Sequence, residues 1–446
     1  MGHPDTLSRR AFLHGAGLAA LAAALAGCAP RETRAVRVAR QTMAALQPAV
    51  TPQPTAGPVR LTYGFPQGAE WAPLQAQLRA FSESGQAPNV EVSHQAISGD
   101  YPSRLRALAA GGLAPDVHLQ IDQDIPSWAR LGLLLRLEPF LVSDPRFDLA
   151  DFDQAHLSSA RHQGQLWALP WCRAGTALFI NRDLFQAAQV PLPPPGWTWN
   201  ELKAAAVALT STGRGQWGCG AVNGWWQMEE RVWQNGAEAF DPGLSRCLLD
   251  QPAAIEAIEF WVDLALKDGA APEPGAAGRS GIGLFLGGRL AMYEEGVWLV
   301  AACKEARFAW DIAPLPRQRR AANVLWSGSQ AIGAHTAHPQ EAWALLKHLT
   351  GTQALEAFAR ALHVLPARQS ARARKPYIDP GMSINWDLVP QTVESGRLPE
   401  SFQSDQVAPL LEELVVDTQR GSETVREAVA RIVPQINALL AQEPAA

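Results

Sequence analysis

From residue 59 onward, the chain alternates short strand-like segments with helical patterns. Residues 59–65 and 90–94 are typical of strands, and the spacing of apolar residues predicts helices over 73–82 and 101–110. Residues 116–121 form a third predicted strand after a helix-breaking Ala-Pro pair. This order of strand, helix, strand, helix and strand favours an α/β fold in which helices cover a parallel sheet.

The same alternation returns in the second half of the chain. A Thr-x-x-Glu capping-box pattern beginning at Thr198 predicts a helix over 198–209, and apolar stripes with helical spacing follow around 255–265, 342–349 and 425–440. Hydrophobic residues make up 47% of the 446 residues and charged residues 18%. That proportion is enough for a large buried core, and the length suggests two to three domains.

Charge and motif content exclude several classes of function. The formal charge is −5, and no block of Lys and Arg is present to neutralise phosphates, so we expect no nucleic-acid partner. The sequence lacks the motifs of a nucleophile-elbow hydrolase, an HExxH metalloprotease and a phosphate-binding loop. His335 and His338 have HxxH spacing, but we interpret the segment as a surface turn and expect neither a metal nor a cofactor.

The N-terminus has the pattern of an export signal. Arg9 and Arg10 precede a run of Ala, Leu and Gly that is too short for a membrane span. The order Ser-Arg-Arg-Ala-Phe-Leu resembles a twin-arginine signal, and Leu-Ala-Gly-Cys ending at Cys28 resembles a lipobox. We therefore predict a lipoprotein signal peptide over 1–28, lipidation of Cys28, and a flexible Pro-containing tether over 29–58. The alternative is an ordinary signal peptide with an incidental cysteine.

Four further cysteines remain after Cys28. They are Cys172, Cys219, Cys247 and Cys303. Export permits disulfides, yet none of the spacings makes a CxxC or zinc pattern. Free buried thiols and a single bridge are both compatible with the sequence.

Five stretches together resemble the family 1 extracellular solute-binding proteins of ABC importers, the group that includes maltose-binding protein. They are 100–117 with its Ala-Pro-Asp-Val ending, 164–170 (GQLWALP), 177–185 (ALFINRDLF) followed by 196–202 (GWTWNEL), 288–298 (GRLAMY and GVW) and 339–350 (PQEAW and LT). Their order between about residues 59 and 441 makes the set specific. The sequence departs from the family at 179–181, where Tyr-Tyr-Asn is usual, and at Glu295, where Asn or Asp is common.

The resemblance implies a periplasmic-binding-protein-like fold. Two discontinuous α/β lobes would be joined by a hinge, with the ligand cleft between them. The expected N-terminal lobe combines 59–173 with 327–365, and the expected C-terminal lobe combines 174–326 with 366–446. Crossings between the lobes are expected near 173–177, 326–331 and 364–370.

Two tryptophans are predicted to stack on the ligand, because a sugar offers an apolar C–H face to an aromatic plane. Trp298 matches the aromatic residue with which the family stacks on sugar, and core packing is the alternative for it. Trp226 lies close to a second such position. Strand-like alternation would point Trp225 the other way, so one residue of this pair is expected in the core.

Polar ligand contacts are expected in loops at strand C-termini, where parallel-sheet clefts open. Glu70 and Trp71 follow the first predicted strand, and Asp122 and Gln123 follow the third. Gln123 stands where the family often carries a sugar-binding carboxylate, and the neighbouring Asp122 could replace that group. A solvated loop is the alternative reading for these side chains.

The predicted crossings supply the remaining candidates. Arg173 is either part of a hinge ion pair or a clamp on the ligand. Gly328 and Ser329 could offer backbone and hydroxyl donors at the second crossing.

These features predict an extracytoplasmic receptor of an ABC importer, not an enzyme. The expected solute is a mono- or oligosaccharide; glycerol-3-phosphate or a glycerophosphodiester is the alternative, and a secreted glycoside-acting enzyme is the alternative of another class. The expected partners are the solute, the permease subunits and a membrane reached through the lipid anchor, on the outer face of the cytoplasmic membrane or in the periplasm. A monomer is expected.

Overall fold

The computed structural model describes residues 58–68, 71–85, 87–99, 101–222, 224–273, 281–399 and 406–441. The predicted signal peptide, Cys28 and nearly all of the predicted tether lie outside these residues, as does Glu70. Among the helices in the described ranges, none combines the length and the apolar character needed to cross a membrane.

Within the described residues, ten strands form one mixed sheet whose main path runs β2-β1-β3-β10-β6-β8-β7. The strands of this sheet are β1 (Val59–Pro66), β2 (Val90–Ile97), β3 (Val117–Ile121), β6 (Ala168–Asn181), β7 (Trp217–Cys219), β8 (Leu290–Gly296), β9 (Trp310–Ala313), β10 (Asn323–Ile332), β11 (Leu365–Pro366) and β12 (Gly396–Arg397). β4 (Arg161–His162) and β5 (Gln165–Leu166) form a separate antiparallel pair.

The helices alternate with these strands. Those of the first half are α3 (Ala72–Glu83), α4 (Tyr101–Ala110), α5 (Ile125–Arg130), α6 (Glu138–Ser143), α7 (Gln154–Ser159), α8 (Arg182–Ala187), α9 (Trp199–Ala208) and α10 (Trp225–Gln234), with the 3₁₀ turns η2 (Asp122–Asp124) and η3 (Thr212–Arg214). Those of the second half are α11 (Pro252–Leu266), α12 (Gly281–Leu286), α13 (Leu299–Cys303), α14 (Pro339–Leu349), α15 (Thr352–Leu362), α16 (Gln369–Arg372), α17 (Leu388–Glu394), α18 (Val407–Gln419) and α19 (Val425–Leu440).

The predicted strand and helix order at the start of the body is confirmed. β1 pairs in parallel with both β2 and β3, and α3 and α4 form the connections between them. The expectation of a parallel sheet is wrong for the middle of the sheet, where β10 runs antiparallel to β3 and β6. The fold class is therefore α/β with a mixed sheet.

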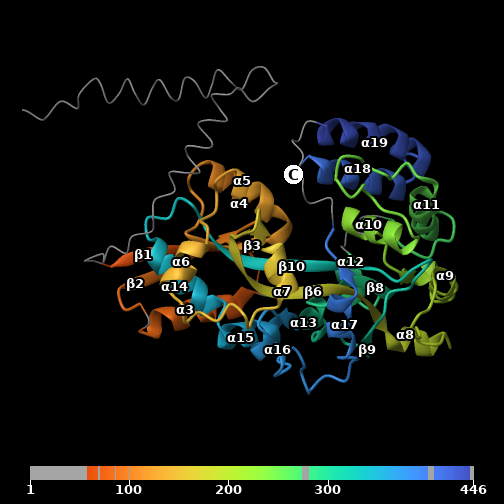
Figure 1. Cartoon of the computed structure of the whole chain (residues 1–446). Coiled ribbons are helices and arrows are strands. Elements are labelled where there is room, and N and C mark those ends of the chain that lie inside the picture. The colour runs from red at the N-terminus through yellow and green to blue at the C-terminus, as the bar shows by residue number, and fades with distance from the viewer. Residues whose placement is uncertain are drawn as a thin grey trace, which may run out of the picture. The chain divides into compact units, whose positions relative to one another are not determined.

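β6 and β10 connect the two ends of the sheet (Figure 1). β6 pairs with β10 between residues 168 and 175 and changes partner to β8 at Thr176. β10 pairs with β3 from Gly328 onward. These partner changes fall at the predicted crossings, and β11 lies in the third predicted crossing. The lobe boundaries themselves stay a prediction.

One hydrophobic core takes its buried residues from two separate parts of the chain, between 178 and 313 and between 407 and 436. It includes residues of α9, α11, α18 and α19, so the last two helices pack against elements formed far earlier in the sequence. The capping box predicted at Thr198 is present, with Glu201 accepting from the backbone N–H of Thr198 at 2.7 Å.

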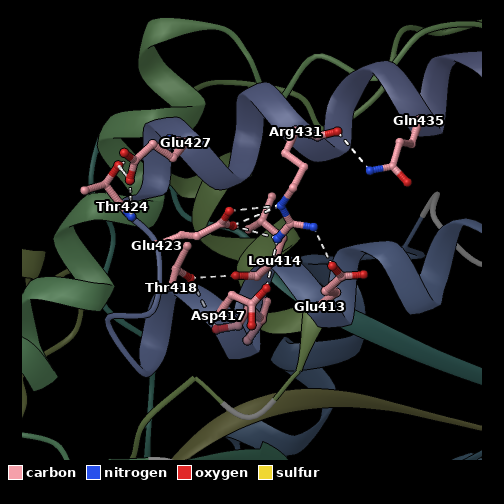
Figure 2. A network of polar contacts seen from close by, with 10 residues as sticks. Glu413, Leu414, Asp417, Thr418, Glu423, Thr424, Glu427, Arg431 and Gln435 are labelled. Atoms are coloured by element: carbon pink, nitrogen blue, oxygen red, sulfur yellow. Dashed lines mark hydrogen bonds and ion pairs between the residues drawn. The ribbon is translucent and has the colours of Figure 1, made fainter.

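α18 and α19 are joined by a polar network centred on Arg431 (Figure 2). Its guanidinium donates to Glu413, to Asp417 at 2.9 Å and to Glu423 at 2.6 Å. The Glu423 and Glu413 carboxylates raise the pKa of Arg431. A capping box of Thr424 with Glu427 fixes the start of α19 beside them, so the turn between the two helices is held from both sides.

Cys172, Cys219, Cys247 and Cys303 are buried free thiols, which settles the alternative that the sequence left open. Burial raises the pKa of Cys303 to about 12, so its thiol stays protonated and unreactive at neutral pH. His335 lies in a turn, as predicted. Across the described ranges, no group of three or more His, Cys, Asp or Glu side chains is placed to hold a metal ion.

Candidate ligand-binding site

Three tryptophan rings meet where α10, the segment before α13 and strand β10 come together. Trp226 and Trp326 have ring centroids 5.8 Å apart with planes at 76°, and Trp298 and Trp326 lie 6.0 Å apart at 74°. Edge-to-face packing at such distances is favourable between aromatic rings. All three side chains are only partly buried. We call Trp226, Trp298 and Trp326 the tryptophan triad; it brings together both predicted stacking residues.

The ring of Trp298 lies directly over Gly296. A Cβ atom at Gly296 would be 2.2 Å from the ring, so only glycine leaves room for it there. Gly296 ends β8, where its backbone N–H donates to the Glu295 carboxylate at 2.9 Å. Burial raises the pKa of Glu295. The hydrogen bonds from Gly296 and Tyr293 lower this pKa but offset only part of the effect of burial.

Trp225 and Trp226 point in different directions because they open a helix. Trp225 packs against the large core described above, whereas Trp226 packs beside Trp326 against the buried residues Trp233 and Val324. Both side chains are partly buried and each packs against a buried cluster, so the prediction that one residue of the pair belongs to the core stays a prediction. Its reason was wrong, since the two residues stand on α10 and not on a strand.

A buried ionic network anchors α10 next to the triad. Arg231 donates to Glu230 and to Glu294. The Glu230 carboxylate also accepts from the Thr176 hydroxyl at 2.8 Å and from the backbone N–H of Val324 at 2.9 Å. Burial raises the pKa of Glu230. The network ties the helix that carries Trp226 to both β6 and β10.

Asp122 is buried and already has internal partners. It accepts hydrogen bonds from Ser159 at 2.7 Å and from Ser327, and His156 Nε2 lies 3.3 Å from its Oδ2 atom. Burial alone would raise the pKa of Asp122, but the interactions with His156 and Ser327 outweigh it and the pKa lies below its usual value. Burial also lowers the pKa of His156. A ligand contact by Asp122 stays a prediction.

Gln123 and Trp71 are partly buried. Both polar atoms of the Gln123 amide are buried and have no hydrogen-bond partner within the described part of the chain, so the donor and acceptor capacity of the group is unused. Trp71 precedes α3, and its ring centroid lies 5.9 Å from that of Trp171. The ring of Trp171 in turn covers Gly328, where a Cβ atom would be 2.4 Å from its Nε1.

Arg173 of β6 forms an ion pair with Asp153, the residue that precedes α7. It is 8% exposed, its Nη1 lies 3.7 Å from Asp153, and its Nε donates to Ser327 at 3.4 Å. Arg372 pairs with the same Asp153 at 3.2 Å. Burial lowers the pKa of Arg173. Arg173 is thus held by an ion pair with Asp153. Both roles that the sequence allowed, a hinge ion pair and a clamp on the ligand, stay predictions.

Gly328 and Ser329 stand where β10 bridges β3 and β6. Gly328 is opposite Ile121 of β3 and Cys172 of β6, and the register with β6 shifts between the two residues. A shift of this kind is a bulge, which re-aims the side chains that follow it.

Sequence reasoning missed two residues of this site, Trp326 and Ser327. Both lie in a predicted crossing, and neither was predicted to have a role. On a strand, neighbouring side chains point to opposite faces. The adjacent Trp326 and Ser327 could therefore have been predicted to face two different environments, one apolar and one polar. Trp326 joins the triad and Ser327 joins Asp122.

Comparison with known proteins places the chain in a family. The model of the bacterial extracellular solute-binding proteins matches residues 76–383. The chain belongs to this family. It is accordingly a binding protein and not an enzyme, and its expected membership is confirmed.

Individual relatives are distant. A maltotriose-binding protein of Pyrococcus abyssi is 23% identical over 59% of this chain, which corresponds to 56% of that protein's length. A lipoprotein of Streptomyces antibioticus is 26% identical over 68% of this chain and 73% of its own. The solved structure of an ABC substrate-binding protein from Listeria monocytogenes, in complex with cycloalternan, has 22% identity and a TM-score of 0.80, covering 86% of this chain and all of that one. This likeness confirms the fold.

Proposed function

We propose that this solute-binding protein is the extracytoplasmic receptor of an ABC importer and binds a mono- or oligosaccharide. The observation that carries the proposal is the tryptophan triad, whose partly exposed rings offer apolar planes to the C–H faces of sugar rings. The maltotriose-binding relative and the neighbour in complex with cycloalternan support a sugar.

Stacking supplies only part of the affinity in this proposal. Two sugar faces of roughly 60 Å² each, at about 25 cal/mol/Å², contribute about 3 kcal/mol, whereas a micromolar complex requires about 8 kcal/mol. Hydrogen bonds supply the remainder. The amide of Gln123 is the best-supported donor and acceptor because its polar atoms lack partners among the described residues. Asp122, Glu70, Trp71, Arg173, Gly328 and Ser329 complete the proposed set.

Closure of two lobes around the solute is the proposed response to binding. The lobes are 59–173 with 327–365 and 174–326 with 366–446, and β6 and β10 are the crossing strands. A ligand shifts the balance toward a closed state only if it binds that state better, which requires contacts to both lobes. Small-angle scattering should therefore give a smaller radius of gyration with saturating solute, and an unchanged radius would indicate a rigid pocket.

Export and anchoring belong to the same proposal. The twin-arginine pattern would direct the chain across the membrane, and acylation of Cys28 would hold it at the outer face of the cytoplasmic membrane or in the periplasm, near the permease subunits. The lipoprotein among the relatives supports the anchor. We propose that the receptor acts as a monomer.

A panel of solutes tests the function. Thermal shift followed by calorimetry should detect binding of maltotriose, cycloalternan or another oligosaccharide in the panel, with glycerophosphocholine as the representative phosphodiester. Chromatography of the bound solute should return it intact. Binding of the phosphodiester alone would replace the sugar assignment, and binding of no member would contradict it.

A further inference from the structure

Trp326 contacts both tryptophans that we propose as stacking residues. Its ring meets Trp226 at 5.8 Å and Trp298 at 6.0 Å, in both cases nearly perpendicular. Trp226 stands at the start of α10 and Trp298 just before α13, so the two rings come from segments about seventy residues apart. Trp326 is the ring that the two share.

The two outer rings depend on such a contact for their orientation. Trp298 is bounded on one side by Gly296, whose Cα it covers, and on another by Trp326. Trp226 is bounded by Trp326 and by the backbone at Gly224, where a Cβ atom would be 3.1 Å from its Nε1. A ring that is fixed before binding loses less conformational entropy when the ligand stacks on it.

Trp326 also stands on the strand that links the two ends of the sheet. Its backbone is opposite Ala174 of β6. The next residue, Ser327, donates to Asp122 and accepts from Arg173, and the residues from Gly328 onward pair with β3. Strand β10 therefore connects the ring of Trp326 to the polar contacts that Ser327 makes with Asp122 and Arg173 on the opposite face of the strand.

We infer that Trp326 is a positioning residue, which holds Trp226 and Trp298 in the orientation that accepts the ligand and sets the affinity through them. The predicted effect on affinity rests on the proposed function, whereas the contacts between the three rings do not. Each edge-to-face pair stabilises the position of its rings beyond the effect of the area that it buries. Loss of both contacts should weaken binding on the order of tenfold, while the rest of the fold keeps its contacts.

The test uses the full chain labelled with 5-fluorotryptophan and followed by ¹⁹F NMR. Trp326→Phe is the test variant because it keeps a ring while removing the indole, and Trp310→Phe is the matched control. Trp310 is also partly buried, and its ring stacks on Phe179 at 6.2 Å. Single Trp→Phe variants assign the signals. In the ligand-free protein, Trp326→Phe should move the signals of Trp226 and Trp298, and Trp310→Phe should leave both in place.

The second arm measures affinity by calorimetry with maltotriose, or with the solute of the panel that binds most tightly. Trp326→Phe should raise the Kd about tenfold with little change in the urea midpoint, and the control should change neither. Unmoved signals for Trp226 and Trp298 would overturn the positioning role. Moved signals with an unchanged Kd would contradict the claim that Trp326 sets the affinity. Moved signals in a protein that binds no solute would support the geometry and contradict the proposed function.

Discussion

The Asp122 carboxylate accepts a hydrogen bond from the Ser327 hydroxyl, a contact between residues 205 positions apart in the sequence. Asp122 follows β3, and Ser327 belongs to β10, which pairs with β3 from the next residue onward. Ser159 of α7 donates to the same carboxylate at 2.7 Å. A buried charge with these partners fixes the junction of three elements.

Asp122→Ala should therefore lower the free energy of unfolding by about 3 kcal/mol, because it leaves buried hydroxyl donors without their acceptor. Ser327→Ala should cost about 2 kcal/mol, since it removes the hydrogen bond that Ser327 donates to Asp122 and the weaker one that it accepts from Arg173. Urea denaturation of both variants and of the double variant measures the coupling between them. A stable Asp122→Ala protein that no longer binds solute would instead establish the ligand contact predicted from the sequence.

Gly296→Ala should weaken binding because the new methyl group would lie 2.2 Å from the Trp298 ring and must displace it. Forcing a methyl into a packed contact typically costs about 1–3 kcal/mol. Calorimetry should show a weaker Kd, and near-UV circular dichroism should report the moved indole. Gly213→Ala is the matched control, since a Cβ there meets nothing within 4 Å. Equal affinity in the two variants would show that the ring position does not matter for binding.

Local sequence patterns predicted the first strands and helices of the body but not the arrangement of the site. β1, α3, β2 and α4 were predictable because apolar periodicity and breakers act within ten residues. The antiparallel insertion of β10 between β3 and β6 was not, because strand order depends on contacts between distant segments. The role of Trp326 follows from that insertion: only the folded sheet places it between Trp226 and Trp298.

For Asp122 the sequence predicts the position of the residue but not its partners. Its position after a strand correctly predicts a polar group at the sheet edge, but not the burial of that group among His156, Ser159 and Ser327. Family resemblance points to the position, whereas the partners that a side chain finds there depend on α7 and β10. The neighbouring Gln123 keeps both polar atoms without a partner in the described part of the chain.

His118 should make stability depend on pH. It is fully buried in β3, and burial lowers the pKa of its imidazole to about 4, well below the usual value near 6.5. Between these two pKa values the unfolded chain binds a proton at His118 that the folded protein does not bind. The contribution of neutral His118 to the free energy of unfolding is therefore complete above pH 6.5 and is lost as the pH falls toward 4. The loss should reach about 3 kcal/mol. Urea denaturation between pH 4 and 7 should give a flatter profile for His118→Leu; parallel profiles would contradict this assignment.

Lipidation of Cys28 is testable in cells. Radiolabelled palmitate should enter the wild-type protein and not Cys28→Ser, because acylation requires the thiol. Replacing Arg9 and Arg10 by Lys should block export if the signal is of the twin-arginine type. Equal labelling of the wild type and Cys28→Ser would contradict the anchor while leaving the binding function intact.

Trp298 and Arg173 distinguish a sugar from a phosphate ligand, because the two chemistries use different side chains. A stacked sugar loses its apolar plane in Trp298→Ala, at a cost of about 1.5–3 kcal/mol in affinity. Arg173→Ala should matter less, since its guanidinium is already engaged by Asp153 and Ser327. A phosphate bound by the Arg173 guanidinium would reverse this order. Its affinity would also fall as salt is added, because ions screen such contacts with a Debye length of about 8 Å at physiological ionic strength. We expect the sugar pattern. Calorimetry of both variants at low and high salt decides between them, and a larger loss from Arg173→Ala together with strong salt dependence would favour the phosphodiester.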